Sequence, residues 1–230
     1  MPDFFKWENA LYFLPKVLSA LPVTLGIVLA ATVSGLVLGL GAALLQVERV
    51  PVARRLCRLY VSFIRGTPII IQMFIVYYGL PLLLLKAGID ITRADKIWFV
   101  YITYGINSGA YFSEIFRSAM LAVPKSQWDA AAAFGLTKAQ TYRRLILPQS
   151  IVIAIPAFGT MMTGLLQDTS LAFTFGILDV IGRVRALGAL TSRILEGYVV
   201  AAGVFVALSL ALEKLFGFIE KRATHQAAVL

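Results

Sequence analysis

One carboxylate and two hydroxyls stand next to each other at Asp168, Thr169 and Ser170, directly after a long stretch without charged residues. A charge inside an apolar segment is costly, so such a residue is by default a candidate for function. The Asp168 carboxylate can bind a positively charged ammonium group, and either hydroxyl can add a hydrogen bond. The alternative is structural, because Asp, Thr and Ser are favoured helix N-cap residues and the apolar segment 171–178 follows.

A second candidate site is the polar segment over residues 124–146. Ser126 and Asp129 have the spacing of a capping box, the alanines after them favour helix, and Gly135 suits the position that ends a helix. We therefore predict a short, exposed helix whose small side chains present a smooth surface to a groove of a partner. The alternative is an ordinary amphipathic connector. Pro148 is expected in the first turn of the apolar helix that follows.

Three further charges, Arg65, Glu114 and Arg117, lie within or beside apolar segments. Glu114 and Arg117 are three residues apart, so on a helix they can form an ion pair, and we assign them to structure. Arg65 precedes Gly66-Thr67-Pro68, which cannot continue as regular helix without adjustment. Its side chain is expected to bind neighbouring carbonyls or a lipid phosphate.

The sequence argues against several kinds of enzyme. It contains one cysteine, Cys57, and one histidine, His225, which exclude an internal disulfide framework and a Cys/His metal cluster. An intramembrane hydrolase with a His base is disfavoured, because His225 lies in the polar tail. The chain also has no G-x-x-x-x-G-K-[ST] loop to hold the phosphates of ATP.

The composition is that of a membrane protein. The chain is 59% hydrophobic and 14% charged, and its mean hydropathy is +0.82. Soluble domains are about 45–50% hydrophobic and about 25% charged. In so apolar a chain the net charge of +9 is more typical of cytoplasmic loops than of nucleic-acid binding. We therefore expect no nucleic-acid partner.

Long uncharged intervals predict an all-α membrane protein with five transmembrane helices, since a bilayer core needs roughly 20 apolar residues of helix. The spans are expected at about 17–47, 59–85, 97–121, 147–167 and 197–219, within one domain over residues 1–230. The first interval is too long for the apolar region of a signal peptide. In it, Gly35, Gly39 and Gly41 allow close contact with another helix.

Five spans place the two termini on opposite sides of the membrane. With the N-terminus outside and the C-terminus inside, the larger share of the 21 Lys and Arg residues lies in the inner segments. The positive-inside rule therefore favours this orientation. The difference in the number of basic residues between the two sides is reduced by Arg183, Arg185 and Arg193, which lie on the outer side.

The segment around Asp129 resembles a known signature. Asp129-Ala130-Ala131, then Gly135, then Leu145-Ile146-Leu147-Pro148 match the spacing of the "EAA, three residues, G, nine residues, I-x-LP" motif of ABC importer permeases. Asp129 replaces the usual Glu and Leu145 replaces the usual Ile, and both replacements keep the chemical type. Further segments are similar to the polar amino acid permease branch: Leu21–Leu25, Ser62–Pro68 with Gln72, Tyr77–Pro81, Ala110–Arg117 and Asp168–Leu171.

The resemblance implies the type I ABC importer permease architecture and a role for the loop 124–146. In that family this loop is the coupling helix, which docks into a cleft of the ATP-binding subunit and transmits nucleotide-driven closure. The residues that match the family motif, and to which the resemblance assigns this coupling role, are Asp129, Ala130, Ala131, Gly135, Leu147 and Pro148. The small alanine side chains let a helix seat closely, and Gly135 lets the chain turn away.

The resemblance also implies a set of partners in the cytoplasmic (inner) membrane. These are two copies of an ATP-binding cassette ATPase, which hold ATP and Mg, a second permease copy or paralogue, an extracytoplasmic solute-binding protein, and membrane lipid. The chain itself is expected to bind no cofactor and to be no enzyme. Loaded binding protein and ATP would open the pair outward, substrate would enter near Asp168, and hydrolysis would reset the pair.

The implied substrate is an amino acid. Asp168-Thr169-Ser170 resembles the family's Lys-Asp-Thr-Ser-Leu pattern, which faces the pathway, although Gln167 replaces the Lys. Met161 stands seven residues before Asp168 and is expected on the same helix face. A thioether cannot neutralise a cation, so Met161 favours a neutral substrate, unless it only packs in the core. The segment 170–179 resembles cystine-importing members, which makes L-cystine the leading substrate.

A secondary transporter or channel for small polar solutes is the alternative function. Uptake by such a protein would depend on an ion gradient and would continue when ATP is depleted. Secondary transporters commonly carry inverted repeats. The five predicted spans show no obvious repeat of this kind and therefore fit that class poorly.

Overall fold

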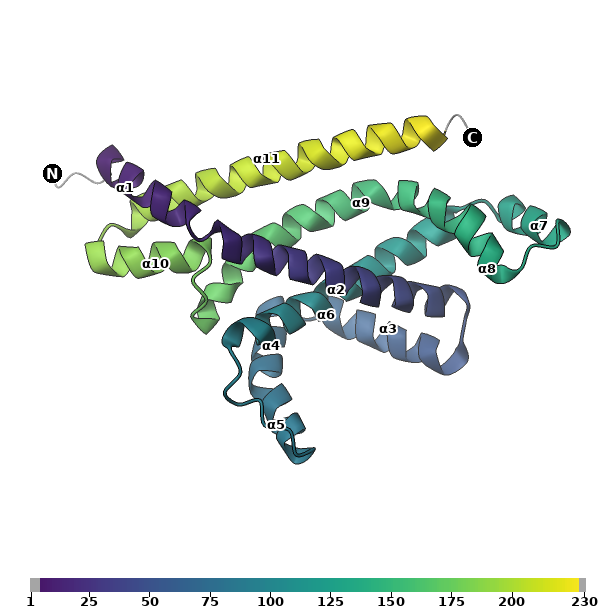
Figure 1. The fold of residues 1–230 in the computed structure, drawn as a ribbon, viewed down its shortest axis with the longest axis horizontal. Helices are drawn as coiled ribbons and strands as arrows, with labels where there is room; N and C mark the ends of the chain where they lie inside the picture. Colours follow the sequence, from purple (N-terminus) through teal and green to yellow (C-terminus); the bar gives the residue numbers. More distant parts are fainter. Residues whose placement is uncertain (1–4, 228–230) are drawn as a thin grey trace.

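The computed structural model describes residues 5–227, and every regular element in this range is a helix (Figure 1). In chain order the α-helices are α1 (Trp7–Leu18), α2 (Leu21–Val47), α3 (Pro51–Arg65), α4 (Ile69–Phe74), α5 (Leu80–Lys86), α6 (Lys96–Ala122), α7 (Lys125–Ala133), α8 (Lys138–Thr141), α9 (Leu147–Asp168), α10 (Val180–Thr191) and α11 (Ile194–Ala227). Two π-helical segments, η1 (Ile75–Gly79) and η2 (Tyr142–Ile146), and a 3-10 helix, η3 (Thr169–Phe175), continue α4, α8 and α9. The predicted all-α fold class is confirmed.

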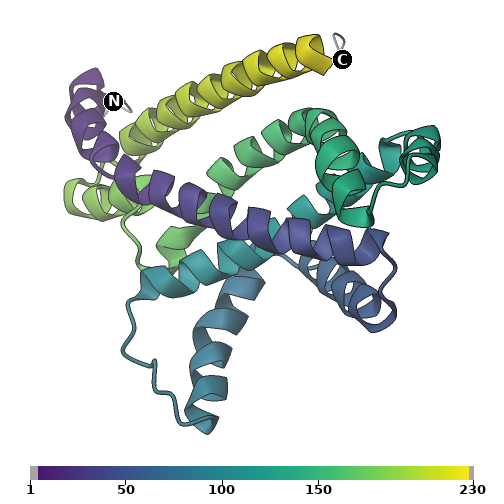
Figure 2. The same cartoon turned by 45° about the vertical axis from the view of Figure 1, so that its right-hand side comes forward.

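The long helices cross one another rather than forming a parallel bundle (Figures 1 and 2). Helix α2 crosses α6, while α9 packs against both α6 and α11. Helices α1 and α10 pack against α11 at one end of the molecule, and α7 and α8 lie at the other end. Helices α4 and α5 project away from the crossing. The two ends of the molecule are thus built from different parts of the chain.

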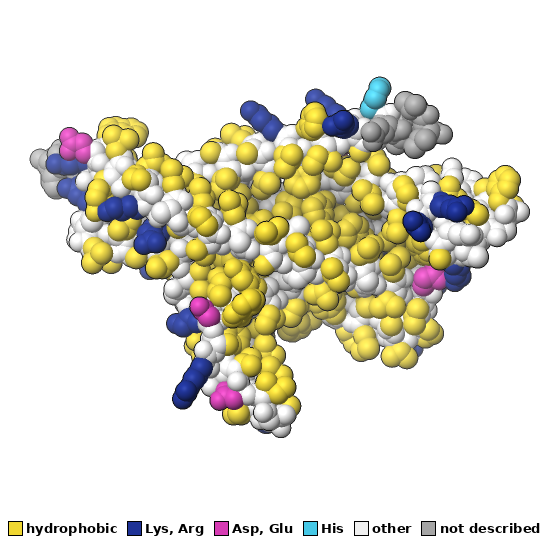
Figure 3. Space-filling model, in the orientation of Figure 1, with side chains coloured by type: hydrophobic (Ala, Val, Ile, Leu, Met, Phe, Trp, Pro, Cys, Tyr) yellow, Lys and Arg dark blue, Asp and Glu magenta, His cyan; other side chains and the backbone are white. Residues whose placement is uncertain are grey.

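Within residues 5–227, four helical segments are long and apolar enough to cross a membrane: Leu21–Val47, Ile69–Lys86, Lys138–Phe175 and Ile194–His225. Helix α6 covers the predicted third span but is not among them, and it carries Asn107 near its middle and Glu114 and Arg117 in its second half. The number of five spans and their orientation therefore remain predictions. Hydrophobic side chains cover the middle of the face shown in Figure 3, with charged side chains mainly toward its ends.

The predicted second span over 59–85 is not one continuous helix. Helix α3 ends at Arg65, and α4 begins at Ile69, after Pro68, which has no N–H to donate. The carbonyls freed by the break accept hydrogen bonds from Nε2 of Gln72, at 2.8 Å from Ile64 and 2.9 Å from Thr67. The buried Gln72 thus replaces the missing backbone donors, and the chain breaks without orphaned carbonyls at these two positions.

The predicted first span also begins later than expected. Residues 17–20 belong to the end of α1 and the turn after it, and the long helix α2 starts at Leu21. Phe13 and Val17 of α1 are fully buried against α10 and α11. This packing fixes α1 as a separate helix, although no charged residue separates it from α2.

Glycines bring α2 and α6 into close contact, as the small residues of the first span suggest. A Cβ atom at Gly35 would lie 2.7 Å from the Cβ of Ser108, and one at Gly39 would lie 2.7 Å from the Cβ of Phe112. Gly41 faces open space in the structure and takes no part in this contact. The two helices therefore approach within a distance that a side chain at either buried glycine would prevent.

We predict that Gly39→Ala destabilises the fold by about 1–3 kcal/mol, because the added methyl group would overlap both Phe112 and the backbone of Ser113. Gly41→Ala is the matched control on the same helix. It should be neutral or slightly stabilising, since alanine favours helix and nothing lies within 4 Å of its Cβ. Thermal unfolding of the detergent-solubilised chain measures both. Equal melting temperatures for the two variants would contradict the close contact.

Candidate functional site

The exposed segment between α6 and α9 begins with helix α7, Lys125–Ala133. Its N-cap is Pro124, and no side chain caps it, so the predicted capping box of Ser126 and Asp129 is wrong. The helix starts one residue before Ser126, which places the serine inside the first turn. A capping box is present at the next helix, α8, where Oγ1 of Thr137 accepts from the N–H of Gln140, and the N–H of Thr137 donates to Oε1 of Gln140.

Helix α7 ends as the sequence predicts. Gly135 has φ +68°, the left-handed conformation that glycine adopts without strain. The N–H of Gly135 donates to the carbonyl of Ala132, and the N–H of Leu136 donates to the carbonyl of Ala131, both at 3.0 Å. This pair of hydrogen bonds is the Schellman motif, which satisfies the last carbonyls of the helix and turns the chain back.

The alanines of α7 do not all face the same way. Asp129, Ala130 and Gly135 are exposed, whereas Ala131 is only 1% exposed and faces the protein. Phe134, which the sequence analysis did not single out, is 85% exposed at the end of the helix. A surface for a partner at this helix therefore includes Ala130 and Phe134, and Ala131 supports it from below.

A charged contact fixes this segment to the end of α2. Glu48 accepts a hydrogen bond at 2.6 Å from Nζ of Lys138 and one at 2.8 Å from Oη of Tyr142. These donors hold the pKa of Glu48 below its ordinary value of 4.5. The contact's contribution to stability is therefore present at neutral pH and is lost as the pH falls through the lowered pKa. Sequence reasoning missed Glu48, because its partners lie 90 and 94 residues away.

Apolar contacts complete the attachment. Ile146 is fully buried in a cluster with Ala43 of α2 and Met120 of α6, and Leu147 packs partly against the same cluster. Pro148 is exposed in the first turn of α9. The segment thus has an exposed tip, which can meet a partner, and a buried base, which joins it to three helices.

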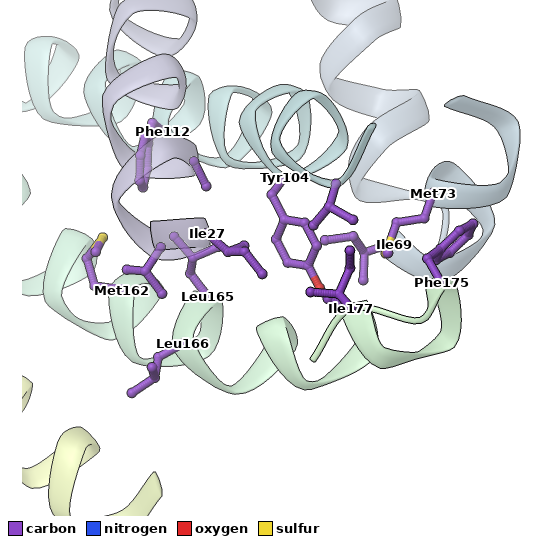
Figure 4. Packing of buried hydrophobic residues seen from close by; sticks show 14 residues of the cluster. Ile27, Ile69, Met73, Tyr104, Phe112, Met162, Leu165, Leu166, Phe175 and Ile177 are labelled. Carbon is purple, nitrogen blue, oxygen red and sulfur yellow. The ribbon is translucent and has the colours of Figure 1, made fainter. Parts of the chain in front are cut away.

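Asp168 lies at the other end of α9, with its side chain exposed. Its carboxylate caps neither α9 nor η3, so the helix-cap alternative is wrong, and the helical chain simply continues through this residue. Its backbone carbonyl accepts a hydrogen bond at 2.5 Å from Oη of Tyr104, a fully buried residue of α6. Figure 4 shows the Tyr104 hydroxyl directed toward the chain that follows α9. The backbone at Asp168 is thus held in place, and its side chain is exposed.

The other three candidate residues at this end differ in accessibility. Thr169 is fully buried, and its hydroxyl donates to the carbonyl of Leu166 at 2.6 Å, so it supports the backbone rather than facing outward. Ser170 is half-buried. Met161 is also half-buried, against the core cluster that contains Tyr104. Asp168 is therefore the exposed member of the predicted group, Ser170 and Met161 are partly accessible, and Thr169 is not accessible.

Asp179 is a buried carboxylate near this end that the sequence analysis did not select. Oδ1 accepts a hydrogen bond from the N–H of Gly182 at 2.8 Å and caps α10, while Oδ2 has no partner among the described residues. Burial raises the pKa of Asp179 to about 6. The sequence signal available for Asp179 was its position one residue before α10, where Asp is a favoured N-cap residue. This position indicates a structural role.

Comparison with known proteins identifies relatives along nearly the whole chain. Residues 35–225 match the family described as binding-protein-dependent transport system inner membrane component. The L-cystine transport system permease protein TcyL of Bacillus subtilis (strain 168) is 40% identical over 91% of this chain and 88% of its own length. The arginine transport system permease protein ArtQ of the same organism is 32% identical over 91% of this chain and 93% of its own.

A solved structure has the same fold. The crystal structure of an amino acid ABC transporter with histidines covers 95% of this chain and 99% of its own, with a TM-score of 0.83 and 28% sequence identity. The family match over residues 35–225 covers the segment from α7 to η2 and both ends of α9. This multi-pass membrane chain belongs to the family of binding-protein-dependent transport system inner membrane components.

Proposed function

We propose that the chain is the membrane subunit of an ATP-driven importer that carries an amino acid across the cytoplasmic membrane. The observation that carries this proposal is the 40% identity with TcyL, which is named as an L-cystine permease. L-cystine is accordingly the leading substrate. The 32% identity with ArtQ, named for arginine, supports the wider class of amino acids.

Within this function the chain supplies a pathway and a mechanical contact rather than catalysis. Two ATPase subunits hold ATP and Mg, a second permease copy or paralogue completes the pathway, and an extracytoplasmic binding protein delivers the substrate. Asp168 accepts hydrogen bonds from the α-ammonium group of the substrate, and the hydroxyl of Ser170 lies beside it on the following residue. The accessible position of the Asp168 carboxylate supports this role.

The segment 124–146 docks on the ATPase. Helix α7 presents Asp129, Ala130 and the exposed ring of Phe134, while Glu48 and Ile146 hold its base against α2 and α6. A movement of the ATPase is then passed to the membrane helices through α8, η2 and α9, which form one helical run from Lys138 to Phe175.

We predict that Asp168→Asn lowers uptake of the transported amino acid by about tenfold or more, because a neutral amide loses the charge-assisted hydrogen bond to an ammonium group. The assay is uptake of radiolabelled cystine, arginine, glutamine and histidine into proteoliposomes that contain the chain, its ATPase and its binding protein. Asp90→Asn is the matched control, since Asp90 is an exposed carboxylate that bonds Thr92 in its own loop. Uptake by Asp168→Asn at the wild-type rate would remove Asp168 from the pathway. Uptake driven by a proton gradient without ATP would overturn the importer itself.

We predict that Ala130→Trp abolishes ATP-dependent uptake while the chain still folds, because a large ring on the exposed face of α7 keeps the helix out of its groove. Ala87→Trp, at an exposed position after α5, is the matched control and should transport normally. Ala131→Trp should instead reduce the amount of folded chain, since Ala131 is buried. The measurements are uptake, co-purification of the ATPase and thermal unfolding. Normal uptake by Ala130→Trp would contradict the docking role.

We predict that Glu48→Gln loosens the base of the segment, because the neutral amide loses the ion pair with Lys138. The effect is modest, since Lys138 is exposed and such pairs contribute about 0.2–1 kcal/mol. Hydrogen exchange of backbone amides in residues 124–146 should accelerate by about two- to fivefold. Asp90→Asn again serves as the control. Unchanged exchange in Glu48→Gln would show that the apolar base alone holds the segment.

A further inference from the structure

A basic cavity lies where the end of α2, the helix α3 and the second half of α6 meet. Its volume is about 720 Å³. Five arginines and one glutamate line it: Arg49, Arg54, Arg58, Arg65, Arg117 and Glu114. The transport function proposed above uses none of them.

One of the five arginines already has an anionic partner. Nε and Nη2 of Arg117 donate to the two carboxylate oxygens of Glu114 at 2.9 and 2.5 Å, which confirms the predicted ion pair. Arg65 lies over the ring of Tyr111, with its guanidinium carbon 5.7 Å from the ring centroid. The side chains of Arg49, Arg54 and Arg58 form no ion pair with any residue that the structure describes. The cavity therefore holds an excess of positive charge that the described chain does not neutralise.

Helix α3 presents three different faces along its length. Val61 and Ile64 are buried in a cluster with Ala110 of α6. Arg54, Arg58 and Arg65, spaced four and seven residues apart, line the cavity. The third face is an apolar stripe at the spacing of one helix side, and each of its residues is more than half exposed: Val52, Leu56, Leu59 and Phe63. With about 3.6 residues per turn, the arginine row and the apolar row lie on roughly opposite sides of α3, which is the pattern of an amphipathic helix at a membrane interface.

The cavity lies at the same end of the molecule as α7 and α8. Glu48, directly before Arg49, bonds Lys138 and Tyr142, which places the turn between α2 and α3 beside α8 (Figures 1 and 2). In the orientation predicted from the distribution of Lys and Arg, this end is cytoplasmic. The inner leaflet carries anionic lipids, and basic pockets between membrane helices on this side bind their headgroups.

We propose that this cavity binds the phosphodiester headgroup of an anionic phospholipid of the inner leaflet. Guanidinium groups bind phosphate oxygens through paired, charge-assisted hydrogen bonds, and several of them surround one small volume here. The amphipathic pattern of α3 places the helix, and the cavity that it lines, at the membrane interface, and this is the reason to prefer a lipid headgroup to a free anion.

The test uses the full chain in detergent, stripped of lipid, with three probes: dioleoylphosphatidylglycerol, dioleoylphosphatidylcholine and inorganic phosphate. Native mass spectrometry counts bound lipid, and thermal unfolding reports stabilisation. Phosphatidylglycerol should bind saturably and raise the melting temperature, whereas the other two probes at equal concentration should not. Arg58→Gln should weaken phosphatidylglycerol binding by about tenfold. The matched control is Arg55→Gln, which removes the same charge from an exposed position of α3 outside the cavity and should bind as the wild type does.

Three results would overturn the proposal. Equal weakening by Arg55→Gln would show a diffuse attraction of charge, and equal stabilisation by inorganic phosphate would show a site for a soluble anion. Equal binding of phosphatidylcholine would show that the charge of the lipid is irrelevant. If Arg58→Gln does not fold, photocrosslinking of wild-type chain with a diazirine-labelled phosphatidylglycerol decides instead. Labelled peptides should then come from residues 51–65 and 114–121, and labelling confined to other helices would refute the site.

Discussion

The close crossing of α2 and α6 holds the rest of the chain in place. Glycines on both helices permit this crossing. A Cβ at Gly109 of α6 would lie 2.9 Å from the Cβ of Leu38, and a Cβ at Gly39 of α2 would overlap Phe112. Gly109 also leaves room for Tyr60 of α3, whose hydroxyl donates to the carbonyl of Ile106. One contact between two helices therefore positions a third. Near the C-terminal end of α2 in the same crossing, the buried Nε2 of Gln46 donates to the hydroxyl of Ser113 at 3.0 Å.

The buried polar groups at the break between α3 and α4 are paired with one another. Gln72 donates to the carbonyls at the break between α3 and α4, and its own oxygen accepts from Nδ2 of Asn107 at 3.0 Å. In an apolar surrounding, an unpaired carbonyl costs several kcal/mol, so a broken helix persists only where a side chain supplies the donor. The polar residues that lower the hydropathy of α6 are thus part of what permits the break in its neighbour.

Features set by neighbours in sequence were predictable, and features set by distant contacts were not. The left-handed Gly135 and the pair of Glu114 with Arg117 depend on residues within one or two turns, and both were predicted. The capping box failed because Pro124 occupies the N-cap position and the helix begins at Lys125, which places Ser126 inside the first turn. The burial of Ala131 could not be read from an alanine run, since propensity says nothing about which side of a helix faces the protein.

Helix α9 connects the two ends at which the proposed function acts. Leu147 joins the base of the docking segment, and Asp168 lies 21 residues later at the opposite end of the same helix. At 1.5 Å per residue this helix is about 33 Å long, which is the thickness of a bilayer core. Pro156 lies near its middle and removes one backbone hydrogen bond there. In the proposed function, a displacement at the segment 124–146 would reach Asp168 through one covalent helical run, and Pro156 is a position at which that run can bend.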